Sequence, residues 1–162
     1  MTAPPLPPRS AEEQAQLDQA LIELMEHRIV FNGVLGLKVQ RLRPGPVQMR
    51  LEMRPDLVGD FVSGRLHGGV ISATLDALGG FAVMAAIGDK HPSEPAAQVL
   101  HRYSRVGTID LRVDYLRQGL GRHFVASAEM MRLGGRVGST QMHLHNDEGL
   151  LIATGAAAYI VS

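Results

Sequence analysis

The sequence predicts an α+β fold in which one long apolar helix packs against an antiparallel β-sheet. From Leu66 to Gly88 the chain is almost continuously apolar and carries a single charged residue, Asp76, which is typical of a helix buried inside a fold. After residue 106, apolar and polar residues alternate in four runs separated by short turns, which is typical of antiparallel strands.

The composition is that of an ordinary globular protein. The chain has 162 residues, 45% of them apolar, a formal net charge of zero and no cysteine. We expect one domain, at residues 10–162. Zero net charge gives no reason to expect a nucleic-acid partner. The lack of cysteine excludes disulfides, a thiol nucleophile and a Cys-ligated metal, and it suits a reducing compartment, so we expect a cytoplasmic protein.

The N-terminal region is predicted to contain an arm and then a helix. Residues 1–9 are Pro-rich and lack the apolar segment of a signal peptide, so we expect a disordered arm. Residues 10–13 form a capping box, and the apolar residues after them recur at helical spacing. We predict an amphipathic helix from about Ser10 to Arg28, which Phe31–Gly36 should end.

The remaining elements follow from alternation and turn residues. Strict alternation in residues 47–53 and the Arg43–Pro46 turn predict a β-hairpin within residues 35–53. A loop, residues 54–66, should lead into the long helix, and a polar loop, residues 88–98, should follow it. Four consecutive strands, expected to pair in sequence order as an antiparallel meander, complete the chain.

The long apolar segment has the length of a membrane span. We do not expect it to cross a membrane, because it contains Asp76, His67 and five glycines and lacks flanking basic or aromatic anchors.

Asp76 is the residue in this helix that most requires an explanation. A carboxylate buried without a partner costs several kcal/mol, and Asp is a poor former of helix interiors. Asp76 is therefore exposed on one face, paired as a structural residue, or functional. Small residues share its face and would let a thin substrate or another backbone approach it; they are Gly69, Ala73 and Gly80, with Ser72 and Gly79 beside them.

His67-Gly68-Gly69 stands where this helix should begin. The first N–H groups of a helix have no intrahelical partner and lie at the positive end of its dipole, and glycines let a ligand atom come close to them. The N–H groups of Gly68 and Gly69 could therefore bind an oxyanion or polarise a carbonyl, while the His67 side chain pins the loop. A plain tight turn into the helix is the alternative explanation.

The spacing of these two features has a consequence for assembly. Asp76 lies nine residues after His67, about 13.5 Å along a helix and roughly half a turn out of phase. One chain therefore cannot easily bring Asp76 and its own helix start to the same carbonyl. If they cooperate, an antiparallel helix pair across a two-fold axis would place Asp76 of one chain near Gly68 of another. This predicts a homodimer with sites at the interface, with a tetramer left open.

With these elements in this order, the chain resembles the hotdog-fold acyl-CoA thioesterases of the phenylacetyl-CoA-type (PaaI-like) branch. The resemblance covers about residues 35–161. It rests on LHGGVISATLD, where family members carry HGG and an acidic residue at this offset, and on GTIDLRVDYL, which resembles the family's third strand. It implies an antiparallel sheet wrapped around the long helix, an added N-terminal helix, and hydrolysis of an acyl-CoA thioester without a cofactor.

The resemblance also implies roles for single residues. The Gly68 N–H would polarise the thioester carbonyl, and Asp76 of the other subunit would act as nucleophile or as general base on water. Thr108 falls where some relatives carry a Ser or Thr that orients the water. Some relatives place an Asn or Gln six residues before the His. Here that position is Phe61, with Ser63 nearby, and this departure favours a more apolar site for a medium or long acyl chain.

Two other groups of polar residues are candidate binding sites. Arg132 and Arg136 flank a hairpin turn and could bind the phosphates of coenzyme A, or be solvated turn residues. His143, His145 and Asp147 put possible ligands on one strand face, but a zinc site needs convergent ligands from another element. Polar alternation explains them better, and no metal is expected.

The sequence is also compatible with three other functions. A hotdog hydratase or dehydratase is one, although its D-x-N-P-x-H motif is absent. A non-catalytic acyl-CoA-binding module is another, although it would not need Asp76. The third is an interaction protein with a structural Asp76, which predicts that protein groups satisfy both carboxylate oxygens and that no cavity adjoins them.

Overall fold

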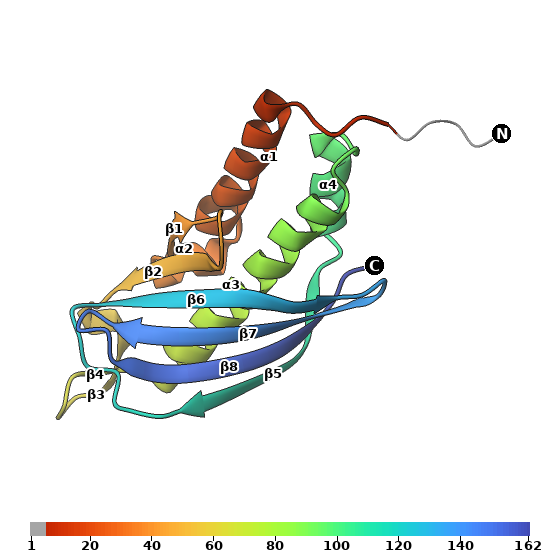
Figure 1. The fold of residues 1–162 in the computed structure, drawn as a ribbon. Coiled ribbons are helices and arrows are strands. Elements are labelled where there is room, and N and C mark those ends of the chain that lie inside the picture. The colour runs from red at the N-terminus through yellow and green to blue at the C-terminus, as the bar shows by residue number, and fades with distance from the viewer. Residues whose placement is uncertain (1–5) are drawn as a thin grey trace.

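The computed structural model describes residues 6–162, which form an antiparallel sheet curved around one long helix (Figure 1). The helices are α1 (Ala11–Glu23), the π-helix η1 (Leu24–Arg28), α2 (Val30–Leu35), the short 3-10 turn η2 (Pro55–Leu57), α3 (Gly68–Lys90) and α4 (Ala96–Tyr103). The strands are β1 (Lys38–Arg41), β2 (Val47–Glu52), β3 (Val58–Asp60), β4 (Arg65–Leu66), β5 (Gly107–Tyr115), β6 (His123–Leu133), β7 (Val137–Asn146) and β8 (Leu151–Ile160).

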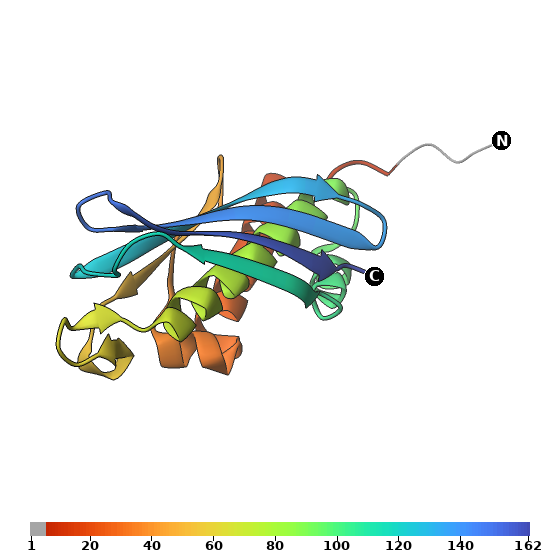
Figure 2. The ribbon, with the colours of Figure 1, turned by 90° about the horizontal axis from the view of Figure 1, so that it is seen from below.

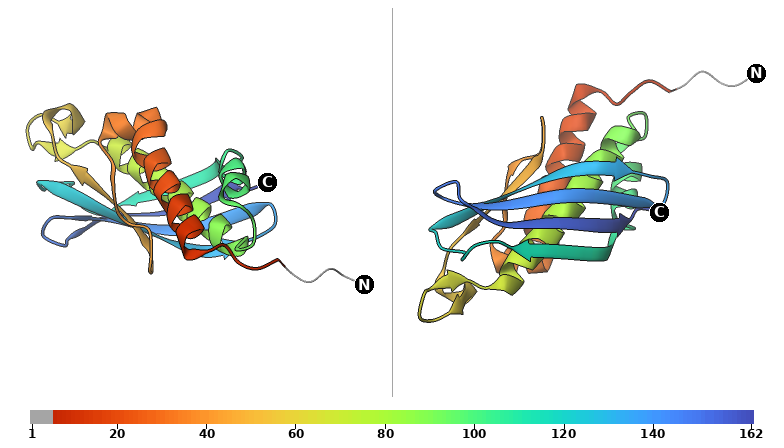
Figure 3. Two further views of the ribbon diagram at one scale, coloured as in Figure 1. Left: turned by 90° about the horizontal axis from the view of Figure 1, so that it is seen from above. Right: turned by 60° about the horizontal axis from the view of Figure 1, so that its bottom comes forward.

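The elements are arranged in layers around α3. The sheet covers one side of α3, and α1 and α2 lie on the side that the sheet leaves open (Figures 2 and 3). This is the predicted hotdog architecture, with its added N-terminal helix, and the fold class is confirmed.

The N-terminal helix begins where the capping box predicts. Ser10 Oγ accepts a hydrogen bond from the Glu13 N–H at 3.1 Å. The helix continues through η1, in which the Ile29 N–H donates to Leu24 O at 3.0 Å. Residues 31–36 were expected only to end this helix, but most of them form α2. This short helix stops at Gly36, whose φ of 76° is left-handed.

The N-terminal arm is fixed before the first helix begins. Residues 1–5 of the predicted arm lie outside the described residues. Arg9 donates hydrogen bonds to His91 O at 2.6 Å and to Gly88 O at 2.8 Å, and its N–H bonds to Pro92 O at 2.7 Å. Arg9, which was predicted to lie in a disordered arm, is therefore bound to the C-terminal end of α3 and the residues after it.

The sheet order corrects one expectation. The strands run β1-β2-β6-β7-β8-β5, all antiparallel, so only β6, β7 and β8 form a meander. β5 pairs with β8 and ends the sheet. Its connection to β6 does not turn back as a hairpin, because it crosses the start of α3, where the Leu66 N–H donates to Gly119 O at 2.8 Å. Alternation predicts a strand but not which strand lies beside it.

Two predicted loops contain regular structure. Residues 54–66 hold η2 and the β3–β4 pair, and the polar segment after α3 leads into α4. Pro95 precedes the first turn of α4, and Val99 and Tyr103, four residues apart, are buried in the core. The spacing of these two side chains is the helical signal that the polar composition obscured.

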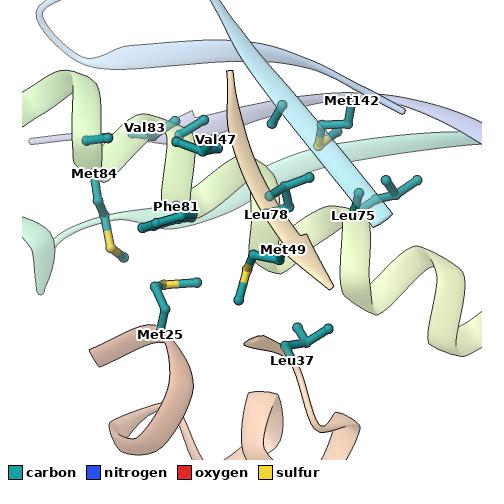
Figure 4. Close-up of a cluster of buried hydrophobic side chains, with 14 of the residues drawn as sticks. Met25, Leu37, Val47, Met49, Leu75, Leu78, Phe81, Val83, Met84 and Met142 are labelled. Atoms are coloured by element: carbon teal, nitrogen blue, oxygen red, sulfur yellow. The ribbon is translucent and has the colours of Figure 1, made fainter. Parts of the chain in front are cut away.

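The core lies between α3 and the sheet. Ile71, Leu75 and Leu78 of α3 are buried, and α3 packs against the strands. Figure 4 shows Leu75, Leu78 and Phe81 of α3 among side chains from β2 and β7. By length and composition α3 could cross a membrane, but most of it is buried within this fold, as in the core helix of a soluble protein.

Candidate active site

Asp76 and Thr108, both predicted site residues, meet in the structure. The Thr108 hydroxyl donates a hydrogen bond to Asp76 Oδ1 at 2.8 Å. Asp76 is half-buried in the middle of α3, and Thr108 lies near the start of the edge strand β5. The hydrogen bond fixes the orientation of the carboxylate and leaves its second oxygen, Oδ2, free to contact a ligand.

A β-bulge brings Thr108 to the helix side of the sheet. Leu111 and Val113 pack against the core, and strict alternation would put Thr108 on the opposite face. The register of β5 against β8 shifts between Thr108 and Asp110, so Ile109 is the extra residue, and its side chain is exposed. A bulge of this kind re-aims a side chain beside a site.

Tyr159 is a site residue that the sequence did not reveal. Its hydroxyl, on β8, donates to Asp76 O at 2.9 Å and lies 3.4 Å from Asp76 Oδ1. Burial and the nearby charge of Asp76 raise the pKa of this hydroxyl, which therefore stays protonated. In sequence, Tyr159 is one member of an apolar strand pattern, so only its position opposite α3 identifies it.

Gly79 provides the space that the Tyr159 hydroxyl occupies. A Cβ added at Gly79 would overlap that hydroxyl and would lie 2.8 Å from Met142 Sδ. At Gly80, one residue further on, an added Cβ would meet only Tyr159 Cε1, at an ordinary 3.7 Å. The two adjacent glycines therefore have different structural roles.

We expect Gly79→Ala to lower the free energy of unfolding by about 1–3 kcal/mol, because Tyr159 must move or the helix must shift. The matched variant Gly80→Ala should be neutral or slightly stabilising, since alanine is the better helix former by ~1 kcal/mol. Denaturant unfolding of both variants at one protein concentration measures this. Equal stability of the two variants would show that Tyr159 has other room to move.

A cavity of about 240 Å³ opens beside Asp76. Its lining is mostly apolar and comes from four parts of the chain: Met25, Ile29, Phe31 and Asn32; Ala73, Asp76, Ala77, Gly80 and Met84; Val106, Gly107 and Thr108; and Tyr159. Among residues 6–162, no protein group donates a hydrogen bond to Asp76 Oδ2. If Asp76 were purely structural, protein groups would satisfy both of its oxygens and no cavity would adjoin it. In the described part of the chain, the structure shows one oxygen without a donor and a cavity beside it, which contradicts this interpretation.

The start of α3 is built around His67. The His67 N–H donates to Leu57 O at 2.9 Å, and His67 Nδ1 accepts from the Gly69 N–H at 2.8 Å. Gly59 lets the loop pass close by, because a Cβ there would lie 2.6 Å from His67 Cα. The Gly69 N–H is thus occupied. The Gly68 N–H has no acceptor within the described part of the chain, which leaves it available to a ligand.

A second cavity, of about 490 Å³, lies at Gly68. The Tyr115 hydroxyl, at the far end of β5, donates to Gly68 O at 3.0 Å and forms part of its wall. Arg65 and Arg117 also line this cavity, and Arg117 Nη1 is held by Leu151 O at 2.9 Å. This cavity is cationic, whereas the cavity at Asp76 is mostly apolar.

The two cavities are separate in one chain. Gly68 and Asp76 are eight residues apart on α3, about 12 Å along its axis. The two cavities have no lining residue in common among those described. One protomer therefore does not bring its own helix start to its own carboxylate, in agreement with the spacing.

Four other predicted binding residues lie away from both cavities. Phe61 is 95% exposed at the β3–β4 tip, where Ser63 Oγ donates to Asp60 Oδ2 at 2.6 Å. Arg132 and Arg136 are exposed near the β6–β7 turn. Within residues 6–162, none of these four lines either cavity, and no three His, Asp or Glu side chains are grouped as metal ligands would be. The roles proposed for the four stay predictions.

Comparison with known proteins gives one consistent result. A family model described as the thioesterase superfamily matches residues 63–153. Proteins named medium/long-chain acyl-CoA thioesterase YigI, from Salmonella typhimurium and Escherichia coli, are 37% identical over 139 residues, which cover 86% of this chain and 90% of theirs. A Shewanella oneidensis protein described as related to the thioesterase superfamily superimposes with a TM-score of 0.89, at 34% identity, over 94% of this chain and all of that chain (100%).

Proposed function

Since this chain belongs to the thioesterase superfamily, we propose that it hydrolyses medium- or long-chain acyl-CoA at a site formed by Asp76 of one subunit and Gly68 of another. Its relatives support the substrate class, because they are named for medium- and long-chain acyl-CoA. The observation that carries the chemistry is Asp76, which lines an apolar cavity: Thr108 fixes one of its oxygens, and no group among residues 6–162 donates to the other. The HGG motif and its spacing to Asp76 support membership of the PaaI-like branch, which stays a prediction.

The edge strand β5 supports a shared site. Asp76 lies by Thr108 at the start of β5, and Gly68 lies by Tyr115 at its end. If two copies of β5 pair antiparallel about a two-fold axis near its midpoint, Thr108 of one comes beside Tyr115 of the other. The same axis brings each Asp76 to the partner's Gly68, and it covers an edge that would otherwise stay unpaired.

Exposed apolar side chains also favour a dimer. The β3–β4 tip carries Phe61 and Val62, and α2 carries Val30, Phe31 and Val34, all exposed. Both segments lie on the helix side of the sheet, as Figure 2 shows. Large apolar patches on a globular protein mark surfaces that another molecule covers. A second copy is the partner we propose, and further pairing of dimers into a tetramer stays a prediction.

The two cavities divide the substrate between them. The apolar cavity at Asp76 suits the acyl chain, and the cavity at Gly68 suits the coenzyme A portion, because Arg65 and Arg117 can bind phosphate. The thioester then lies where Asp76 and the partner's Gly68 meet. These two arginines are closer to Gly68 than the predicted pair on the β6–β7 turn, which stays a candidate for an outer phosphate.

The chemistry needs few groups because a thioester is already activated. The Gly68 N–H donates to the carbonyl oxygen and stabilises the negative charge that develops there. Asp76 Oδ2 then acts in one of two ways. It attacks the carbonyl carbon, expelling the coenzyme A thiolate and forming a mixed anhydride that water cleaves, or it takes a proton from an attacking water. A single turnover in isotopically labelled water separates the routes, because only the anhydride route can leave label in Asp76.

The test of the function is thiol release from a series of straight-chain acyl-CoAs, from butanoyl- to hexadecanoyl-CoA. We expect one free acid and one coenzyme A thiol per substrate consumed, with the highest kcat/KM among the medium and long chains. Tight binding of all substrates with no thiol released would identify a binding module instead. A trans-2-enoyl-CoA is tested beside the series, and loss of its double bond without thiol release would identify a hydratase. A cytoplasmic location remains a prediction from the sequence.

A further inference from the structure

The cavity at Asp76 follows one face of α3. Ala73, Asp76, Ala77, Gly80 and Met84 line it, and they recur at three- and four-residue intervals. Near the carboxylate this face is made of small residues, and it ends at a methionine. Asp76 and Met84 are about 12 Å apart along the helix axis. A linear chain that starts at Asp76 would therefore run along Gly80 and meet Met84.

The opposite wall is supplied by the N-terminal helical segment. Met25, Ile29, Phe31 and Asn32 line it, and all of them precede residue 63, where the match to the family model begins. This wall therefore lies outside the part of the chain that the family model matches.

The π-helix and Asn32 fix the position of Met25. The extra residue of a π-helical turn leaves backbone carbonyls in need of other donors, and such turns often occur at functional sites. Asn32 Nδ2 donates to Met25 O at 2.9 Å, and the Asn32 side chain is buried. Met25 is therefore held by backbone contacts as well as by packing.

Met25 and Met84 lie at the end of the cavity away from Asp76, which we take as its closed end because both side chains are buried. They are only 1% and 9% exposed, whereas Phe31, which also lines the cavity, is 58% exposed and stands toward solvent. Figure 4 shows the two methionine side chains extending toward each other from η1 and α3. We propose that Met25 and Met84 set the length of the acyl chain that this enzyme accepts. The proposal rests on the proposed thioesterase function.

The size of the cavity agrees with a medium-length chain. A methylene group fills about the same volume as a water molecule in the liquid, ~30 Å³, so the cavity of about 240 Å³ has room for several methylene groups. Each buried methylene contributes ~0.8 kcal/mol, equal to a factor of about four in kcat/KM. Methylene groups beyond the two methionines should not be buried and should add nothing to kcat/KM. The rise of kcat/KM with acyl-chain length should therefore level off at the length that reaches Met25 and Met84.

The test compares variants that change the closed end in opposite directions. Met84→Phe fills the end, and Met25→Ala opens it. The readout is the ratio of kcat/KM for dodecanoyl-CoA to that for hexanoyl-CoA, because a general loss of activity cancels in the ratio. We expect Met84→Phe to lower the ratio by about 4- to 15-fold, the loss of one or two methylene sites. Met25→Ala should shift the optimum to chains about two carbons longer, with an ordinary cavity cost in stability.

Leu21→Ala is the matched control. Leu21 is fully buried one turn before Met25, but among the described residues it is not part of the cavity lining. Its substitution removes similar volume from the same segment and should leave the chain-length ratio within about twofold of wild type. If Met84→Phe fails to fold, Met25→Ala alone still decides the proposal.

The outcomes separate this proposal from the function on which it rests. Wild-type enzyme that releases no thiol from any acyl-CoA would refute the thioesterase function. An active wild type whose ratio is unchanged in Met84→Phe and in Met25→Ala would refute the proposal and leave the function intact. An equal shift in Leu21→Ala would attribute the effect to general loosening of the N-terminal segment.

Discussion

Replacement of Asp76 by Asn is expected to lower kcat/KM for acyl-CoA by ~10²–10⁴-fold, the usual effect of losing a general base or a comparable group. The amide has the size of the carboxylate, and its oxygen can still accept the hydrogen bond that Thr108 donates at 2.8 Å. The substitution therefore removes the negative charge and basicity with little change of shape. Thiol release at saturating and limiting substrate measures kcat and kcat/KM separately.

The pattern of the two kinetic constants tests the role of Asp76 more closely than the size of the loss. A group that acts in the transition state should lower kcat and kcat/KM together, with KM nearly constant. Asp56→Asn is a matched control, because Asp56 is an exposed carboxylate on η2 and lines neither cavity among the described residues. Full activity in Asp76→Asn, with the protein folded, would remove Asp76 from the mechanism.

The sequence predicts those parts of this site that depend on one helix. Asp76 in an apolar segment, the small residues on its face and the glycines at its start are all visible at fixed spacing. The distance between Gly68 and Asp76 follows from helix geometry alone. These features could be placed because an α-helix converts sequence separation directly into distance.

The parts of the site that depend on pairing between distant segments could not be read in this way. Thr108 reaches Asp76 only through a bulge, and its family resemblance suggested the role without the geometry. Tyr159 and Asp76 are 83 residues apart, and no local pattern links them. The position of β5 at the sheet edge depends on a crossover, and the cavity that Met25 lines is completed by residues of α3, β5 and β8 that lie far from it in the sequence. Each of these outcomes is fixed by tertiary packing.

Subunit complementation is expected to restore activity to a mixture of two inactive variants, Asp76→Asn and Gly68→Pro. Proline is compatible with the first position of a helix and removes the N–H there. His67, which would precede it, already has φ −65° and ψ 135°, the extended conformation that a following proline requires. Loss of this one donor should lower kcat by about 10²–10³-fold.

Gly68→Ala is the matched control for the proline variant. An added Cβ at this position would meet Tyr115 Cε1 at 3.4 Å, the same neighbour that proline would meet. Alanine keeps the N–H, so Gly68→Ala should lose far less activity than Gly68→Pro. Equal losses in the two variants would assign the effect to crowding against Tyr115.

The mixture tests whether one site draws on two chains. In a heterodimer, one of the two sites combines the intact Asp76 of the proline variant with the intact Gly68 N–H of the asparagine variant, and the other site has neither. Random exchange makes half of the dimers mixed, each with one working site of two, so about a quarter of wild-type activity should return. A site contained within one chain would give no recovery, because every chain carries one lesion. Persistent inactivity after subunit exchange, demonstrated with differently tagged chains, would therefore contradict the pairing of β5 with a second β5.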